Sequence, residues 1–225
     1  MPLTELEKIF NSAKQSASPV EMMRAIIPLV NAYQQARKYD TAIRCLKEML
    51  PIIRDKGEMD QEAVILTALG TAYWEKAQLQ KALNHFEEAL KVFKEVHDKQ
   101  GIAIILCIVG ITFWRKCDWD KALEILKDAL KQNGEKKVEQ RFASLYGAFD
   151  RGIATLQNRV RMGRELQDPV KILQPLFSMC LLYWVIGNHG QFKVCLDEAV
   201  ALAQSLNKTD ILQAAEGIRQ LGHPV

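Results

Sequence analysis

The chain has 225 residues, of which 48% are hydrophobic, and this is enough to bury a substantial core in one domain. Its 30 basic and 27 acidic side chains give a net charge of +3, a balance that does not favour nucleic-acid binding. No run of about eighteen apolar residues and no signal-peptide pattern is present, and the five cysteines are scattered, so we expect reduced thiols, no membrane span and a cytoplasmic location.

Two helix-start signals open the chain. Thr4 and Glu7 form a capping box, in which a hydroxyl group precedes a carboxylate by three residues, and this predicts a capping helix over residues 4–16. Ser18, followed by proline at the first helical position, starts the next helix. We therefore expect the first helical pair to occupy about residues 20–56.

The next two segments, about residues 60–98 and 100–133, repeat one pattern at an offset of 40 residues. The first carries Leu69, Gly70, Tyr73, Ala82, Phe86 and Ala89, and the second carries Val109, Gly110, Phe113, Ala122, Leu126 and Ala129. A fixed period of this size predicts a helical solenoid. Glycine inside a helix costs about 1 kcal/mol relative to alanine, so its recurrence at the same place predicts that two helices cross closely there.

Beyond these repeats the pattern changes. Apolar residues at three- and four-residue spacing from Val138 to Val160 predict one long amphipathic helix over about residues 136–164. We then expect a degenerate repeat over about residues 169–205 and a C-terminal capping helix over about residues 210–221. The whole chain is thus interpreted as a single helical domain.

The central repeats resemble the tetratricopeptide repeat (TPR) family. Residues 66–89 match its pattern of leucine-glycine, a tyrosine three residues later, then alanine, phenylalanine and a second alanine, and residues 106–129 match it more loosely. The resemblance is weaker over residues 170–205. The period of 40 exceeds the usual value of about 34, as in a longer-repeat branch of the family. The resemblance implies an all-α fold, a right-handed α-solenoid of antiparallel helix pairs that the long helix interrupts.

In the TPR family, the first helices of the pairs line a concave groove that binds partners. The resemblance implies that the groove of this chain is formed by Trp74, Thr67, Thr71, Ile104, Cys107, Ile108, Ile111, Trp114, Phe177, Leu181 and Trp184. The lysine and asparagine side chains with which some members grip a C-terminal carboxylate are absent, which disfavours a co-chaperone role. Monomers rarely expose a large apolar patch, so we expect this groove to be covered. The candidates are an amphipathic segment of a partner protein, the chain itself through its long helix or a tight superhelix, or a second copy of the chain.

Four arginines lie in the second half of the predicted long helix: Arg151, Arg159, Arg161 and Arg164. They form either a solvated helix face or a basic docking patch for an acidic partner, nucleic acid or a membrane surface. The neighbouring Glu165 and Asp168 disfavour nucleic acid as that partner.

No catalytic arrangement is recognisable in the sequence. The four histidines are far apart, no glycine-rich phosphate loop or serine-centred turn is present, and no cysteines and histidines have metal-ligand spacing. We therefore expect no enzymatic activity, no cofactor and no metal. The first hypothesis is an adaptor or assembly factor that binds an amphipathic protein segment in the apolar groove. The alternative is a regulatory sensor that binds a short peptide or small ligand and changes the shape of the superhelix, and an enzyme with an unrecognised site is the third.

Overall fold

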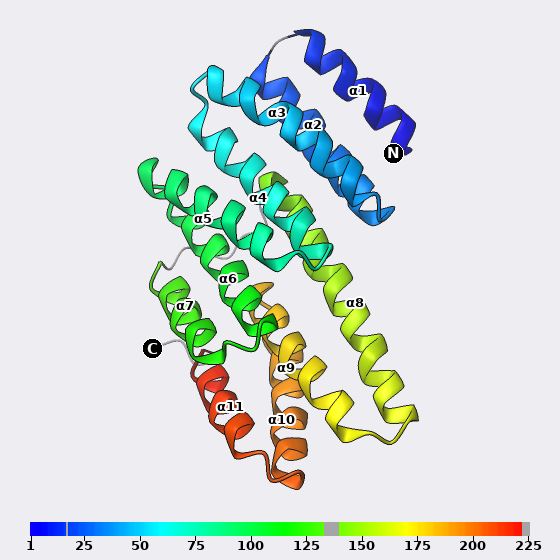
Figure 1. The fold of residues 1–225 in the computed structure, drawn as a ribbon, viewed down its shortest axis with the longest axis vertical. Helices are drawn as coiled ribbons and strands as arrows, with labels where there is room; N and C mark the ends of the chain where they lie inside the picture. Colours follow the sequence, from blue (N-terminus) through cyan, green and yellow to red (C-terminus); the bar gives the residue numbers. More distant parts are fainter. Residues whose placement is uncertain (17, 133–139, 222–225) are drawn as a thin grey trace. The chain divides into compact units, whose positions relative to one another are not determined.

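The structure is a computed structural model, and it describes residues 1–16, 18–132 and 140–221. Its elements are α1 (Leu3–Ser16), α2 (Pro19–Gln35), α3 (Tyr39–Asp55), α4 (Met59–Glu75), α5 (Leu79–Glu95), α6 (Lys99–Arg115), α7 (Trp119–Lys131), the 3₁₀ turn η1 (Gln140–Phe142), α8 (Ala143–Glu165), α9 (Pro169–Val185), α10 (His189–Ser205) and α11 (Thr209–Leu221) (Figure 1). The predicted all-α fold of antiparallel helix pairs is confirmed. The predicted start of the long helix near residue 136 lies outside the described residues, and α8 begins at Ala143. None of the described helices combines the length and the apolar character needed to cross a lipid bilayer.

Eight turns in the described ranges share one backbone geometry. Each contains a residue with positive φ, at Arg37, Gly57, Ala77, His97, Cys117, Gln167, Gly187 or Asn207. The amide of the following residue donates to a carbonyl five residues earlier, as Gln78 N does to Tyr73 O at 3.0 Å. This is a Schellman cap, which satisfies carbonyl groups that the end of a helix leaves without partners. From Arg37 to Cys117 the caps recur every 20 residues, and α2 to α6 are each 17 residues long.

Glycines permit the close helix crossings that the repeat pattern predicts. A Cβ atom at Gly70 of α4 would lie 2.5 Å from Cε1 of Phe86 in α5. A Cβ atom at Gly110 of α6 would lie 2.7 Å from Cγ of Leu126 in α7. Both distances are shorter than real Cβ contacts, so only glycine allows these helices to approach as they do. The predicted close crossings are therefore confirmed.

The chain forms two compact units, and the first comprises Met1–Ile105 and Lys137–Ala148. Within it, α1 to α5 pack in sequence, each against the next (Figure 1). Every residue from Ala63 to Trp74 of α4 is buried. A helix is buried on all faces only when other elements surround it, and α4 packs against α2, α3, α5 and η1.

The turn η1 is fixed to the first unit by an aromatic contact and an ion pair. The ring of Phe142 lies 5.9 Å from the ring of Phe93 in α5, in an edge-to-face arrangement. Arg141 donates to one carboxylate oxygen of Asp98, and the other oxygen accepts the amide of Gly101 at 2.9 Å. Asp98 therefore caps α6 and holds η1 at the same time.

The second unit comprises Leu106–Lys136 and Phe149–Val225. Its centre is α9, in which every residue from Pro175 to Val185 is buried. The last helix, α11, packs against α7, α9 and α10.

Two contacts fix α11 within the second unit. A Cβ atom at Gly217 would lie 2.5 Å from Cδ1 of Leu123, so α11 and α7 touch closely. The buried Trp184 of α9 donates from Nε1 to the carbonyl of Leu221 at 2.9 Å. The C-terminal helix is thus attached to both α7 and α9.

Candidate ligand-binding pocket

The predicted groove residues are buried in the structure. At most 7% of the surface is exposed at each of Trp74, Thr67, Thr71, Ile104, Cys107, Ile108, Ile111, Trp114, Phe177, Leu181 and Trp184. Thr67 and Thr71 also use their hydroxyl groups inside α4, where they donate to the carbonyls of Ala63 and Thr67 at 2.8 Å. The chain itself covers these side chains, so they do not form an open surface in this conformation.

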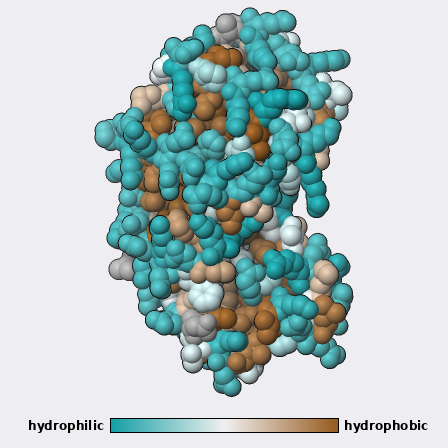
Figure 2. Space-filling view, in the orientation of Figure 1, coloured by the Kyte–Doolittle hydropathy of each residue, from teal (hydrophilic) through white to brown (hydrophobic). Residues whose placement is uncertain are grey.

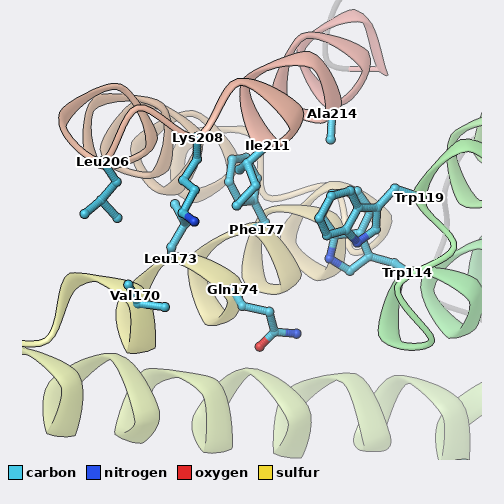
Figure 3. Close-up of a pocket in the computed structure, with 10 residues that line it drawn as sticks. All are labelled: Trp114, Trp119, Val170, Leu173, Gln174, Phe177, Leu206, Lys208, Ile211 and Ala214. Atoms are coloured by element: carbon cyan, nitrogen blue, oxygen red, sulfur yellow. The ribbon is translucent and has the colours of Figure 1, made fainter.

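Trp114 and Phe177 nevertheless line an open pocket in the second unit (Figure 3). The pocket is lined by Trp114, Trp119, Val170, Leu173, Gln174, Phe177, Leu206, Lys208, Ile211 and Ala214, and its volume is about 140 Å³. We call it the Trp114 pocket. Its walls come from the end of α6, the start of α7, α9, the α10–α11 turn and α11.

Three aromatic rings form one wall of the Trp114 pocket. The centroid of the Trp114 ring lies 5.9 Å from that of Trp119 and 6.1 Å from that of Phe177. Favourable aromatic pairs have centroid distances of about 4.5–7 Å. Trp119 returns to Trp114 because Cys117, at a φ of 61°, reverses the chain between α6 and α7. The α6–α7 turn and α9 therefore hold this wall ready before any ligand arrives.

The rim of the Trp114 pocket is exposed and carries one charge. Val170 is 59% exposed, and Gln174 and Lys208 are exposed as well. Gln174 donates from Nε2 to Oγ of Ser178 at 3.2 Å, which orients its amide along α9. Of the lining residues that the structure describes, Lys208 is the one with a charged side chain, and no described residue forms an ion pair with it. In Figure 3, Lys208 extends from the α10–α11 turn toward Leu173 of α9.

An apolar surface adjoins this rim. Met162 and Leu166, near the end of α8, are 55% and 61% exposed, and Val170 follows at the start of α9. Figure 2 shows hydrophobic surface near the C-terminal end of α8. We call Met162, Leu166 and Val170 the α8–α9 patch. Val170 belongs both to this patch and to the rim of the pocket.

The predicted basic patch lies on α8, where Arg159, Arg161 and Arg164 are exposed and Arg151 is half-buried. Arg164 forms an ion pair with Glu198 of α10, and Nε of Arg161 lies 3.9 Å from Oε1 of Glu165. Burial, together with the charge of Arg159, lowers the pKa of Arg115 in α6. Arg161 and Arg164 are thus partly neutralised by carboxylates. The use of the four arginines as a docking patch stays a prediction.

Sequence reasoning missed most of the pocket lining. Lys208 and Ile211 belong to a segment that was predicted only as a turn and a capping helix. The available signal was Trp119, because the first position of a helix is usually solvated and a tryptophan there indicates an aromatic neighbour. In the described ranges, no group of three or more His, Cys, Asp or Glu side chains could hold a metal ion.

Comparison with protein families gives two matches. A tetratricopeptide repeat model matches residues 21–95 and 61–133, which together make up half of the chain. A model described as anaphase-promoting complex subunit 5 matches residues 108–182 and 126–218. No curated protein sequence is significantly similar to the chain.

Comparison with solved structures gives matches of low sequence identity. The crystal structure of BtubC (BKLC) from P. vanneervenii has a TM-score of 0.55 and 17% identity, and the alignment covers 92% of this chain and 91% of that protein. TPR-like repeats described as those of a kinesin light chain from Podosopora anserina have a TM-score of 0.47 and 15% identity, with 85% of this chain and 99% of that one covered. At these identities the likeness concerns the fold alone. With half of its length matched by the repeat model, the chain belongs to the tetratricopeptide repeat family, whose members are typically protein–protein interaction modules and generally not enzymes.

Proposed function

We propose that this chain is a non-enzymatic adaptor or assembly factor that holds a segment of a partner protein at the Trp114 pocket. The observation that carries the proposal is an open apolar pocket whose aromatic wall is built from three different helices. Interfaces draw most of their binding energy from a few anchor side chains, and these anchors fill well-packed pockets lined by aromatic residues. A protein-binding family and a preformed anchor pocket point to the same role.

The pocket suits a partner better than the buried groove does. Ile108 and Leu181 are 0% exposed, so a partner would have to displace helices of the chain to reach them. A side chain that enters between Val170 and Lys208 meets the aromatic wall without such a displacement. The other predicted groove residues would join the interface only if the helices that cover them moved. The α8–α9 patch adds exposed apolar surface along which the rest of the segment could lie.

Two valines of the second unit provide a matched test. Val170, at the rim of the pocket, is 59% exposed, and Val194, on α10 outside the lining, is 58% exposed. Neither side chain belongs to the core, so replacing either with aspartate should leave the melting temperature nearly unchanged. A native-host extract is passed over the immobilised full chain, and proteins retained at stoichiometric levels are identified.

We expect Val170→Asp to lose the retained protein, because a carboxylate at the rim must be desolvated when an apolar segment docks. The Val194→Asp variant should retain the protein as well as the unmodified chain does. Equal retention by both variants would contradict the use of this pocket.

A regulatory sensor is the second candidate, and the size of the pocket favours it. A volume of about 140 Å³ is enough for one ring-sized ligand. The helix α11 forms part of the wall, so a bound ligand would stabilise its attachment to the second unit. A sensor predicts that a small ligand raises the melting temperature and changes the hydrodynamic radius of the chain without any second protein.

A further inference from the structure

We infer that the occupant of the Trp114 pocket is an acidic peptide segment, in which one leucine or phenylalanine side chain fills the cavity and a neighbouring carboxylate pairs with Lys208. This inference rests on the proposed function and names the chemistry of the partner. It follows from the volume of the pocket, from the charge at its rim and from the charges on the adjoining helix.

The volume selects a single side chain of moderate size. An apolar cavity of about 150 Å³ inside a protein binds benzene, and the Trp114 pocket encloses about 140 Å³. One phenyl ring or one leucine side chain therefore fills it. The walls are formed by Trp114, Phe177, Leu173 and Ala214, so the group that enters must be apolar over its whole surface.

The positive charge at the rim favours a negative charge on the peptide residue next to the apolar anchor. Among the described residues that line the pocket, Lys208 is the one charged residue, and none carries a carboxylate. Aromatic walls can also attract cations, but a cationic segment would meet the like charge of Lys208, and no carboxylate belongs to the described lining. An anionic segment gains an ion pair at the same place.

The backbone of Lys208 is held in place, and its side chain is exposed. Its amide donates to the carbonyl of Ala203 at 3.0 Å, and its carbonyl accepts the amide of Leu212 at 3.0 Å. The ammonium group therefore starts from a fixed point beside the pocket and can reach a carboxylate outside the cavity. At the rim, the charge of Lys208 favours ligands that carry a carboxylate beside the apolar group, and the ammonium group itself stays outside the apolar interior.

The α8–α9 patch has the same preference. Arg159 on α8 is exposed, and no described residue forms an ion pair with it. Its charge is also felt by Arg115, whose pKa is lowered by burial and by Arg159. The acidic side chains of this stretch, Glu165 and Asp168, already lie near Arg161 and Lys171. A segment that runs along the end of α8 to the pocket would therefore meet Arg159 at one end and Lys208 at the other, which favours acidic residues around its apolar anchor.

Three peptides that differ only in charge test the inference. They are acetyl-Gly-Asp-Phe-Asp-Gly-amide and its analogues with asparagine or lysine in place of both aspartates. Each is titrated into the full ¹⁵N-labelled chain, and binding is followed at the indole N–H signals of Trp114 and Trp119. An exposed charge pair contributes modestly, so the acidic peptide should bind roughly two- to fivefold tighter than the neutral one. The basic peptide should bind most weakly.

Variants at one exposed position assign this order to Lys208. The Lys208→Ala chain should bind the acidic and neutral peptides equally, and the Lys208→Glu chain should prefer the basic peptide. Lys193→Ala is the matched control, because Lys193 is exposed on α10 and lies outside the lining. That variant should keep the original order. Equal binding of all three peptides, tightest binding of the basic peptide, or no change at either indole would each overturn the inference.

The failure of this inference can be told apart from failure of the proposed function. If Val170→Asp abolishes retention of the partner while the peptides show no acidic preference, the pocket binds protein but the occupant is not acidic. If the acidic preference holds while Val170→Asp still retains the partner, the chemistry of the pocket stands and its role as the protein-binding site is refuted.

Discussion

The α4–α5 pair of the first unit and the α9–α10 pair of the second unit share helix length and turn geometry, but they differ in the residues at the point where the helices cross. All four helices are 17 residues long, and both pairs are joined by the same capped turn. The twelfth residue is Gly70 in α4 and Cys180 in α9. The fourth residue is Ala82 in α5 and Phe192 in α10. The two pairs therefore have the same helix length but different residues at the crossing.

The two crossings are filled by different chemistry. Gly70 lies directly against the ring of Phe86. At the other crossing, burial and the neighbouring thiol of Cys195 in α10 raise the pKa of Cys180 well above its usual value. The comparison shows that capped turns and apolar faces determine the length and pairing of the helices. The side chains at the point of closest contact differ from one pair to the next.

Removing the ring at the first crossing should have the largest effect. Phe86 is fully buried, so Phe86→Ala should lower the free energy of unfolding by about 3–5 kcal/mol. Gly70→Ala should lower it by about 1–3 kcal/mol, because the new methyl group meets the Phe86 ring. In the double variant the methyl group occupies space that the ring has left, so the combined loss should be smaller than the sum.

Urea unfolding of the four chains measures this coupling. Gly190→Ala is the control, because a Cβ atom there would meet only Oδ1 of Asn188 at 3.9 Å, and it should not destabilise the chain. Additive losses for Phe86→Ala and Gly70→Ala would show that the two residues do not share a crossing.

The polar contact of Asp98 should have the next largest effect. Asp98→Ala removes the helix cap of α6 and the partner of Arg141, and we expect a loss of about 2 kcal/mol. Asp60→Ala, an exposed site in the first turn of α4, should change stability by less than about 0.5 kcal/mol.

This contribution should also depend on pH. Burial alone would raise the pKa of Asp98, but the hydrogen bonds from Arg141 and the Gly101 amide outweigh it and hold the pKa below its usual value. A carboxyl group with a lowered pKa in the folded state stabilises fully above its unfolded pKa of about 3.9 and loses this contribution as the pH falls. The difference in melting temperature between the natural chain and Asp98→Asn should therefore shrink from about pH 6 to about pH 2. A difference that stays constant over this range would rule out the ionised contact.

Exchanging the residue at the second crossing should have a smaller effect. Cys180→Gly removes a buried thiol and places glycine inside α9, so it should cost about 1–2 kcal/mol. If the variant were more stable than the natural chain in urea, α9 and α10 would be able to approach each other as closely as α4 and α5 do. The α9–α10 crossing would then not depend on the larger residue at position 180.

Substitutions in the turns of the two pairs should change stability in opposite directions, and these changes should be the smallest. The α4–α5 turn has Ala77 at a φ of 59°, and the α9–α10 turn has Gly187 at a φ of 75°. A non-glycine residue pays about 1 kcal/mol in this conformation, so Ala77→Gly should stabilise and Gly187→Ala should destabilise by about that amount. Differential scanning calorimetry checks both signs. Two shifts of the same sign would contradict a shared cap geometry.

The sequence predicts the fold well because its strongest signal is local. Gly70 and Gly110 stand at one place in two successive repeats, and the structure shows the close contact that this recurrence predicts. The α9–α10 pair gives a weaker pattern because Cys180 and Phe192 replace the small residues, although Tyr183 and Trp184 keep their positions.

The pocket was only partly predictable, for a physical reason. The resemblance to the tetratricopeptide repeat family predicts Trp114 and Phe177 as groove residues, and both line the pocket. Lys208 and Trp119 enter the pocket through the turns that precede α11 and α7, and their approach depends on tertiary packing that no spacing rule contains. Burial of the remaining groove residues also depends on packing, because it requires knowing which elements surround α4 and α9.

The recurring helix caps have a consequence for how rapidly this chain can reach its native state. Each cap is closed by an amide and a carbonyl five residues apart, as between Asn188 and Tyr183, so the boundaries of a helix can form before distant segments meet. Chains dominated by such short-range contacts fold in microseconds to milliseconds, because little loop entropy is lost before the first native contacts form. Single helices can therefore form early, whereas α11 can attach to α7 and α9 only after those two helices have folded.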